Sequence, residues 1–139
     1  MKLNLACAFL LLSLHSVPQE TQKPVEEKPA VESKNTSEAE KLVNPVKPTT
    51  SSIESGKKIY AFDCAMCHGK EGAGDGDLAG DMHLKLRDYR DPAALKDLTD
   101  GMIYSTIANG KGEMTGEGAR TKPEQVWDLV NYLRSLAKK

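Results

Sequence analysis

The stretch "CAMCHG" constrains this chain of 139 residues more than any other feature. Cys64 and Cys67 are separated by two residues, and His68 follows directly. The remaining cysteine, Cys7, lies in the apolar amino terminus, and His83 alone cannot complete the four ligands of a structural zinc site. A thioredoxin-like redox pair would follow a strand in a βαβ pattern, and nothing before Cys64 reads as such a strand. A structural zinc site and a redox disulfide therefore both suit this stretch poorly.

The spacing instead suits covalent attachment of a c-type haem. On one helical turn Cys64 and Cys67 are i and i+3 neighbours, so both thiols can form thioethers with the haem vinyl groups. His68 lies four residues after Cys64 on the same face, where its imidazole can point at the iron. We therefore expect one haem c, held by Cys64 and Cys67 and ligated by His68.

The amino terminus has the pattern of an export signal. Its apolar run, Leu3–Leu14, is about as long as a signal h-region and shorter than the ~20 residues that a spanning helix needs. A lipid anchor on Cys7 would require Leu where Asn4 stands. We expect a signal peptide over residues 1–16 and a periplasmic or otherwise exported mature protein, unless the signal is retained as a tether.

Composition divides the remaining chain at residue 53. Residues 17–52 are rich in Pro, Glu, Lys, Ser and Thr and contain no aromatic side chain, so we predict a disordered spacer. Residues 53–139 contain the single Trp and all four Tyr and are the candidate folded domain. The chain has a formal net charge of −1 and no basic cluster of the kind that binds nucleic acid.

Residues 53–139 resemble a monohaem class I c-type cytochrome of the bacterial kind. Three ordered features carry the resemblance: a helix leading into "CAMCHG", a Gly-rich loop with a Met, and an aromatic-bearing carboxy-terminal helix. It implies an all-α cytochrome c fold, with three to four helices wrapped around one covalently attached haem. It also implies that Gly56 and Tyr60 of the first helix cross the last helix near Tyr132.

Local patterns independently indicate the helices. "TKPEQVWDLVNYLRSLAKK" opens with Thr121 as N-cap and Glu124 as its capping-box partner, and it carries one apolar face. "TDGMIYSTIANGKG" predicts a helix capped by Thr99 or Asp100, and "SIESGKKIYAFDCAMC" predicts the first helix. "RDPAALKDL" is compatible with a shorter helical turn, and no segment alternates clearly enough to predict a strand.

The second axial ligand has several candidates. Met66 lies between the haem cysteines and is tied to the proximal side. The resemblance places the distal ligand in the Gly-rich loop before the last helix, where Met114 stands in "NGKGEMTGEGAR". Met82, Met102, His83 and an open site remain alternatives, although a Met on a helix face is more often a core residue.

Other positions near the expected site depart from the family or admit two interpretations. Thr115 and Asp77 each stand where the family commonly has a proline. Tyr89, Arg87 and Arg90 in "LRDYRD" are candidates to bond haem propionates, but an exposed charged turn is the favoured explanation.

Two filled axial positions suit electron transfer better than catalysis. No substrate reaches the iron without displacing a ligand, and a thioether stabilises ferrous iron. We expect a soluble or tethered one-electron carrier, not an enzyme, that is monomeric and exchanges electrons with a dehydrogenase or reductase and an oxidase. Membrane contact is expected only through a partner complex or an uncleaved amino terminus. A haem enzyme or gas sensor, and a subunit of a larger respiratory complex, are the alternatives.

Overall fold

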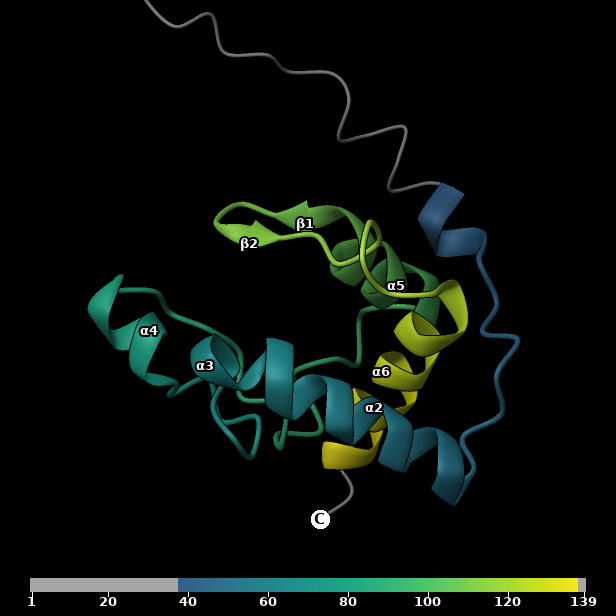
Figure 1. Ribbon diagram of the computed structural model, residues 1–139, viewed down its shortest axis with the longest axis horizontal. Coiled ribbons are helices and arrows are strands. Elements are labelled where there is room, and N and C mark those ends of the chain that lie inside the picture. The colour runs from purple at the N-terminus through teal and green to yellow at the C-terminus, as the bar shows by residue number, and fades with distance from the viewer. Residues whose placement is uncertain (1–37, 138–139) are drawn as a thin grey trace, which may run out of the picture.

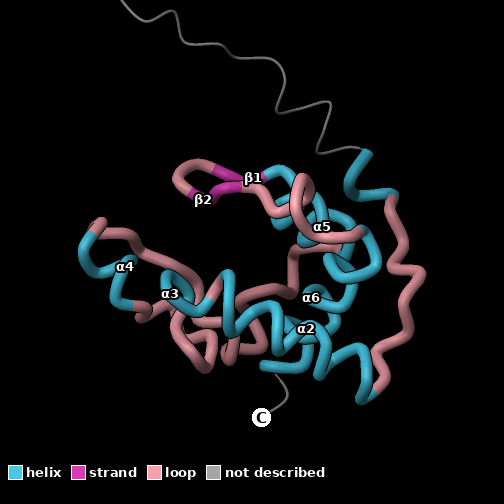
Figure 2. Tube along the Cα trace, in the orientation of Figure 1, coloured by secondary structure: helices cyan, strands magenta, loops and turns pink. Residues whose placement is uncertain are grey.

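The computed structural model describes residues 38–137, and helices dominate this part of the chain (Figures 1 and 2). The elements run in the order α2 (Thr50–Asp63), α3 (Ala65–His68), α4 (Asp77–Asp81), α5 (Asp100–Asn109), β1 (Gly110–Lys111), β2 (Met114–Thr115) and α6 (Pro123–Leu136). A further helical turn covers residues 38–41. The predicted all-α class is confirmed, with one addition: the two short strands pair as an antiparallel hairpin that the sequence did not predict.

Helices α2 and α6 cross at the centre of the core (Figure 1). Gly56 permits the close approach, because a side chain at this position would collide with the main-chain carbonyl of Asp128. One turn later, the rings of Tyr60 and Tyr132 lie with their centroids 5.2 Å apart. The predicted crossing near Gly56, Tyr60 and Tyr132 is therefore confirmed.

Apolar side chains of α5 and α6 form most of the remaining core. Helix α5 lies against α6, and Tyr104 stacks on Trp127 at a centroid distance of 4.2 Å. Eight aliphatic or indole side chains of α5 and α6 are buried in the core: Ile103, Ile107, Val126, Trp127, Leu129, Val130, Leu133 and Leu136. The apolar face predicted for the last helix is the face that is buried.

The start of α6 differs by one residue from the prediction. Lys122 is the N-cap, and the side chain of Gln125 accepts a hydrogen bond from the Lys122 amide at 3.2 Å. The capping box predicted for Thr121 and Glu124 is therefore wrong. The amide of Thr121 instead donates to the carbonyl of Glu117 at 2.9 Å, which keeps Thr121 in the preceding turn.

The other helix boundaries agree more closely with their local signals. Thr99 caps α5 by accepting a hydrogen bond from the Met102 amide at 3.2 Å, as predicted. Residues 92–97 form consecutive turns without becoming a helix. The predicted first helix is interrupted at Cys64, which ends α2 and opens α3.

The predicted disorder of residues 38–52 is wrong. Helix α2 begins at Thr50, and the side chain of Ser52 is buried. Ahead of this helix, residues 38–49 run along the outside of the domain from α5 to the start of α2 (blue in Figure 1). Its contacts with the domain combine polar side chains with two small apolar ones, Ala39 and Val46, and this mixture gives no apolar pattern in the sequence. The rest of the predicted spacer, 17–37, and the predicted signal peptide lie outside the described residues.

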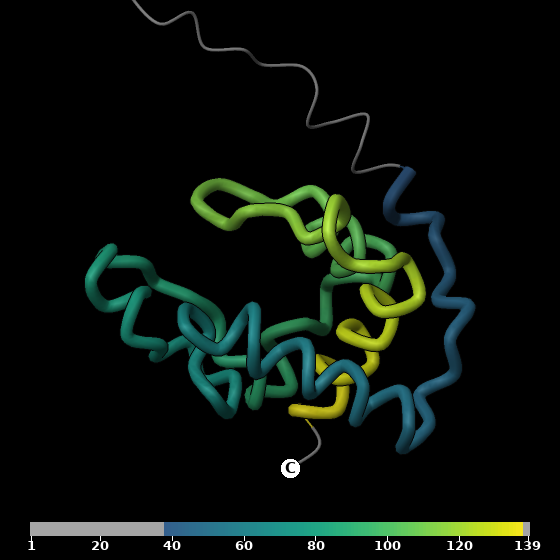
Figure 3. Tube along the Cα trace, viewed as in Figure 1, coloured from purple at the N-terminus to yellow at the C-terminus, as the bar shows by residue number. Residues whose placement is uncertain are grey.

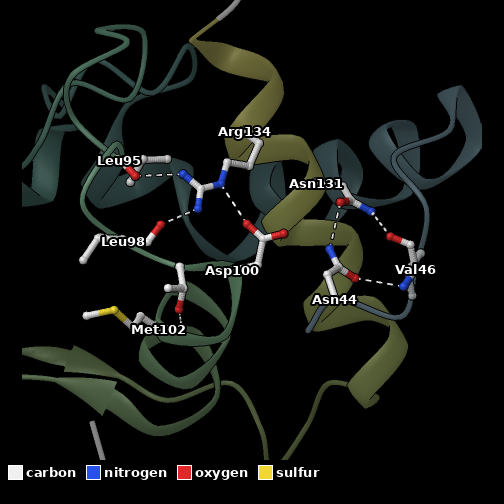
Figure 4. Close-up of polar contacts among 9 residues, drawn as sticks. Asn44, Val46, Leu95, Leu98, Asp100, Met102, Asn131 and Arg134 are labelled. Atoms are coloured by element: carbon white, nitrogen blue, oxygen red, sulfur yellow. Dashed lines mark hydrogen bonds and ion pairs between the residues drawn. The ribbon is translucent and has the colours of Figure 1, made fainter. Parts of the chain in front are cut away.

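The main anchor of this amino-terminal segment is Asn131 on α6. Its Oδ1 accepts a hydrogen bond from Asn44 Nδ2 at 2.9 Å, and its Nδ2 donates to the Val46 carbonyl at 3.0 Å (Figure 4). The folded unit therefore begins well before residue 53.

Candidate functional site

A cavity of about 540 Å³ lies between the α2–α3 junction, the turns before α5, α5 itself and the hairpin. In Figures 1 and 3 the hairpin faces α3 and α4 from the opposite side of the domain. The wall of the cavity includes apolar side chains from the turns before α5, from α5 and from α6: Leu95, Leu98, Ile103, Ile107, Leu129 and Leu133. This size and lining are typical of a pocket that encloses an organic cofactor.

The α2–α3 junction presents the "CAMCHG" motif to this cavity. The amides of Cys67 and His68 both donate to the Cys64 carbonyl, at 3.2 and 2.9 Å, so the three residues share one helical turn as their spacing predicts. Tyr60 Oη donates to the Gly69 carbonyl at 2.8 Å, which ties α2 to the end of the motif. Cys64 and His68 line the cavity, whereas Cys67, partly buried in the same turn, is not part of the lining.

Burial determines the protonation of the motif. It raises the pKa of the Cys64 thiol to about 12, with a smaller contribution from the charges of Glu117 and Asp63. It also lowers the pKa of His68 below its usual value. At neutral pH the side chains are therefore a thiol and a neutral imidazole, and the neutral imidazole is the form that binds a metal.

Met114 enters the same cavity from the hairpin. Gly110 and Gly112 have positive φ angles of 79° and 59°, which side-chain-bearing residues rarely adopt, and they let the chain reverse between β1 and β2. Lys111 pairs with Met114 across the hairpin, and the Met114 side chain packs against the buried core. The Gly-rich loop therefore places one thioether in the cavity wall.

The other candidate ligands are distributed differently. Met66 and Met82 are 60% and 42% exposed, and neither lines the cavity. His83 is also exposed, with a φ of 55°, and is not part of the lining. Met102 does line the cavity, from α5. The structure thus brings Met114 and Met102 to the cavity and leaves Met82 and His83 outside it.

The "LRDYRD" turn divides between the cavity and the surface. Tyr89 and Arg87 line the cavity. Arg90 does not, and it forms an exposed ion pair with Asp88 at 2.7 Å. The surface-turn interpretation therefore applies to Arg90, while Arg87 and Tyr89 face the space that a cofactor would fill.

Arg134 supports the cavity wall in a way that the sequence analysis missed. Its Nε donates to Asp100 at 2.9 Å, Nη1 donates to the Leu95 carbonyl at 2.8 Å, and Nη2 donates to the Leu98 carbonyl (Figure 4). Because Leu95 and Leu98 line the cavity, this one guanidinium fixes the wall to α6. A lone basic residue within the apolar stretch "LVNYLRSL" was the available signal.

These residues fit a covalently attached haem. One thiol, an imidazole and a thioether line one largely apolar cavity, and the second thiol lies in the same helical turn as the first; these are the groups of a c-type haem site. The buried Nδ1 of His68 has no hydrogen-bond partner within residues 38–137. Over the same residues there is no group of three or more His, Cys, Asp or Glu side chains that could hold a free metal ion. None of the helices described is long and apolar enough to cross a bilayer.

Comparison with known proteins gives one consistent family. The family model described as "Cytochrome c" matches residues 53–137. The Cbb3-type cytochrome c oxidase subunit FixP of Azorhizobium caulinodans is 31% identical over 97 residues, which cover 63% of this chain and 28% of FixP. Cytochrome c6 of Porphyra purpurea is 29% identical over 87 residues, which cover 63% of this chain and 74% of that protein.

A solved structure supports the same fold. The KustC0563 c-type cytochrome matches with a TM-score of 0.52 and 29% identity, covering 58% of this chain and 95% of that one. This chain spans most of cytochrome c6 and of KustC0563, but only 28% of the length of FixP.

Proposed function

Because this chain belongs to the cytochrome c family as a class I c-type cytochrome, we propose that it is a one-electron carrier with a single haem held by Cys64 and Cys67. In this proposal His68 and Met114 are the axial ligands of the haem iron. The observation that supports it most directly is that His68, from α3, and Met114, from β2, line the same cavity.

When bound, a c-type haem supplies an iron that changes its charge by one electron. The chain contributes the environment of that change. His68 is held neutral by burial and can ligate through a ring nitrogen. Leu95 and Leu98, fixed by Arg134, are part of an apolar wall that limits access of water. Low polarity around an iron site favours its less charged, reduced form, and so does a thioether ligand.

We further propose that the carrier works outside the cytoplasm and is not itself an enzyme. The apolar run near the amino terminus supports export. Its partners would be redox proteins, because a covalently held haem delivers electrons where its edge meets another protein. A free carrier and a subunit of a larger oxidase assembly are both compatible with this chemistry. The match to an oxidase subunit favours testing the second role by co-purification with a membrane complex.

Haem attachment is tested on a denaturing gel. The exported protein should retain haem after denaturation and stain by its peroxidase activity, because thioethers survive unfolding. Replacing both Cys64 and Cys67 by Ser should abolish the stain. A wild-type protein that folds stably without haem would refute the proposal.

The identity of the distal ligand is tested by two matched substitutions. Met114→Ala should remove the weak far-red absorption of the oxidised protein that a thioether ligand gives, lower the reduction potential and admit carbon monoxide. Met102→Ala removes a thioether of the same kind from α5. It should retain that absorption and cost stability by leaving a cavity. The opposite pattern would identify Met102 as the ligand.

A further inference from the structure

The imidazole of His68 lies against the ring of Tyr89. The ring centroids are 5.2 Å apart and the planes are inclined by only 25°, so the contact is a stacked one. Both side chains line the cavity. Stacking between near-parallel rings restricts their relative tilt, because the contact is lost when one ring turns away from the other.

Hydrogen bonding does not supply this restraint among the described residues. A histidine that ligates a metal usually donates its second ring N–H to a carboxylate, carbonyl or water, and this bond fixes the rotation of the ring. The buried Nδ1 of His68 has no carboxylate or carbonyl partner within residues 38–137. Among these residues, the stacked ring of Tyr89 is a contact that can hold the imidazole plane.

The backbone places Tyr89 firmly enough for this role. Its amide donates to the Gly72 carbonyl at 2.7 Å, and the Gly74 amide donates to the His68 carbonyl at 2.8 Å. The short loop that follows the "CAMCHG" motif thus binds both partners of the stack. Gly72 has a φ of 79°, and a side chain there would press on Leu136 and come into contact with Tyr89, so this loop is closely fitted.

We propose that Tyr89 is a positioning residue that sets the orientation of the His68 imidazole by ring stacking, in place of a hydrogen bond to Nδ1. The proposal rests on the proposed function, in which His68 ligates the haem iron. The orientation of the axial imidazole plane, together with that of the thioether ligand, influences how unpaired electron density is distributed over the haem in the oxidised, low-spin state. Met114 is unchanged in the variants compared below, so a change in this distribution reports on the imidazole. The shifts of the haem methyl protons report that distribution directly, and ordinary changes in stability do not alter their order.

The test compares two substitutions of Tyr89 in the haem-loaded protein. Tyr89→Phe keeps the ring, and the order of the haem methyl signals in the proton NMR spectrum of the oxidised protein should stay as in the wild type. Tyr89→Leu removes the planar surface, and the order or the total spread of these signals should change. Tyr104→Leu is the matched control, because Tyr104 also stacks on a ring, that of Trp127, but does not line the cavity. It should lower stability and leave the methyl order unchanged.

Two results would overturn the proposal. An unchanged methyl pattern in Tyr89→Leu would show that Tyr89 is an ordinary packing residue. A changed pattern in Tyr89→Phe would assign the effect to the hydroxyl group, and this measurement holds even where Tyr89→Leu does not fold. A failure of the proposed function is distinguishable from both, because the wild-type protein would then show no spectrum of a covalently bound low-spin haem.

Discussion

Replacing Asn131 by Ala tests whether residues 38–49 belong to the cooperatively folded unit. Asn131 is only 5% exposed. Its side-chain amide makes three hydrogen bonds to the chain before α2 and at the start of α2. It accepts from Asn44 at 2.9 Å, donates to the Val46 carbonyl at 3.0 Å and donates to Ser52 Oγ at 2.9 Å. Removing this one side chain therefore removes all three of these bonds between α6 and the chain before and at the start of α2.

The magnitude follows from these three bonds. Each neutral hydrogen bond contributes about 0.5–1.5 kcal/mol to stability, so we expect Asn131→Ala to lower the free energy of unfolding by about 2–4 kcal/mol. Ser52 keeps its bond to Asp128 at 2.6 Å, and Asn44 is only partly buried and can turn to water, which limits the further cost of unsatisfied partners. A change of about 2 kcal/mol or more lowers the Tm of a domain of this size by roughly 8 °C or more.

The assay is reversible thermal and urea unfolding of the mature, haem-loaded protein, followed by far-ultraviolet circular dichroism. Asn44→Ala removes one of the three bonds and should cost about 1 kcal/mol. A chain that begins at Thr49 should lose nearly as much stability as Asn131→Ala. The control is Arg90→Ala, because Arg90 is exposed, pairs with Asp88 at 2.7 Å and does not line the cavity, so its Tm should stay close to that of the wild type. Equal Tm values for Asn131→Ala and Arg90→Ala would refute the reasoning.

Three other perturbations have expected outcomes. Gly56→Ala should lower the free energy of unfolding by about 1–3 kcal/mol, measured by thermal unfolding, because the added methyl group meets the Asp128 carbonyl. Gly80→Ala is the control, and it should leave the Tm unchanged because the space around Gly80 is open. Arg134→Lys should cost about 2–3 kcal/mol in urea unfolding because an ammonium cannot reach Asp100 and two carbonyls at once. Arg90→Lys, in the exposed pair with Asp88, should leave the urea midpoint close to that of the wild type. Hydrogen bonds from Arg90 lower the pKa of Asp88 to about 2, so any stabilisation from this pair is present above the unfolded value near ~3.9 and is lost as the pH falls through about 2. Carboxylate NMR titration of the wild type and of Arg90→Ala checks this, and an unchanged Asp88 midpoint in the variant would contradict it.

Features that depend on neighbouring residues could be predicted from the sequence. The spacing of Cys64, Cys67 and His68 predicts one helical turn, and the main-chain hydrogen bonds to the Cys64 carbonyl form that turn. Thr99 has the short oxygen-bearing side chain that a helix start requires, and it caps α5. Gly56 could be related to a helix crossing through the family resemblance, because a missing side chain matters most where two backbones meet.

Features that depend on distant residues could not be predicted in the same way. Asn44 and Asn131 are 87 residues apart, and neither has a neighbour in sequence that indicates the other. The strands β1 and β2 have two residues each, which is too short for an alternating pattern to be visible. The cap at Lys122 depends on a turn that ends at Thr121, and that turn is formed by a bond to Glu117. In each case a tertiary or turn contact overrides a reasonable local preference.

The two sides of the domain are stabilised by different kinds of contact. The α2–α6 crossing consists of close backbone approach at Gly56 and buried rings, and one of these rings, that of Tyr60, also lines the cavity. The cavity wall consists of turns and a short hairpin, and long-range polar contacts hold several of its parts. Arg134 fixes the carbonyls of Leu95 and Leu98, and Gly72 accepts the amide of Tyr89. A substitution at Gly56, which does not line the cavity, should therefore change the Tm while leaving the spectrum of the site intact. Substitutions in the wall should change the spectrum or the potential even where the loss of stability is small, because the wall determines which side chains face the cofactor and in what orientation.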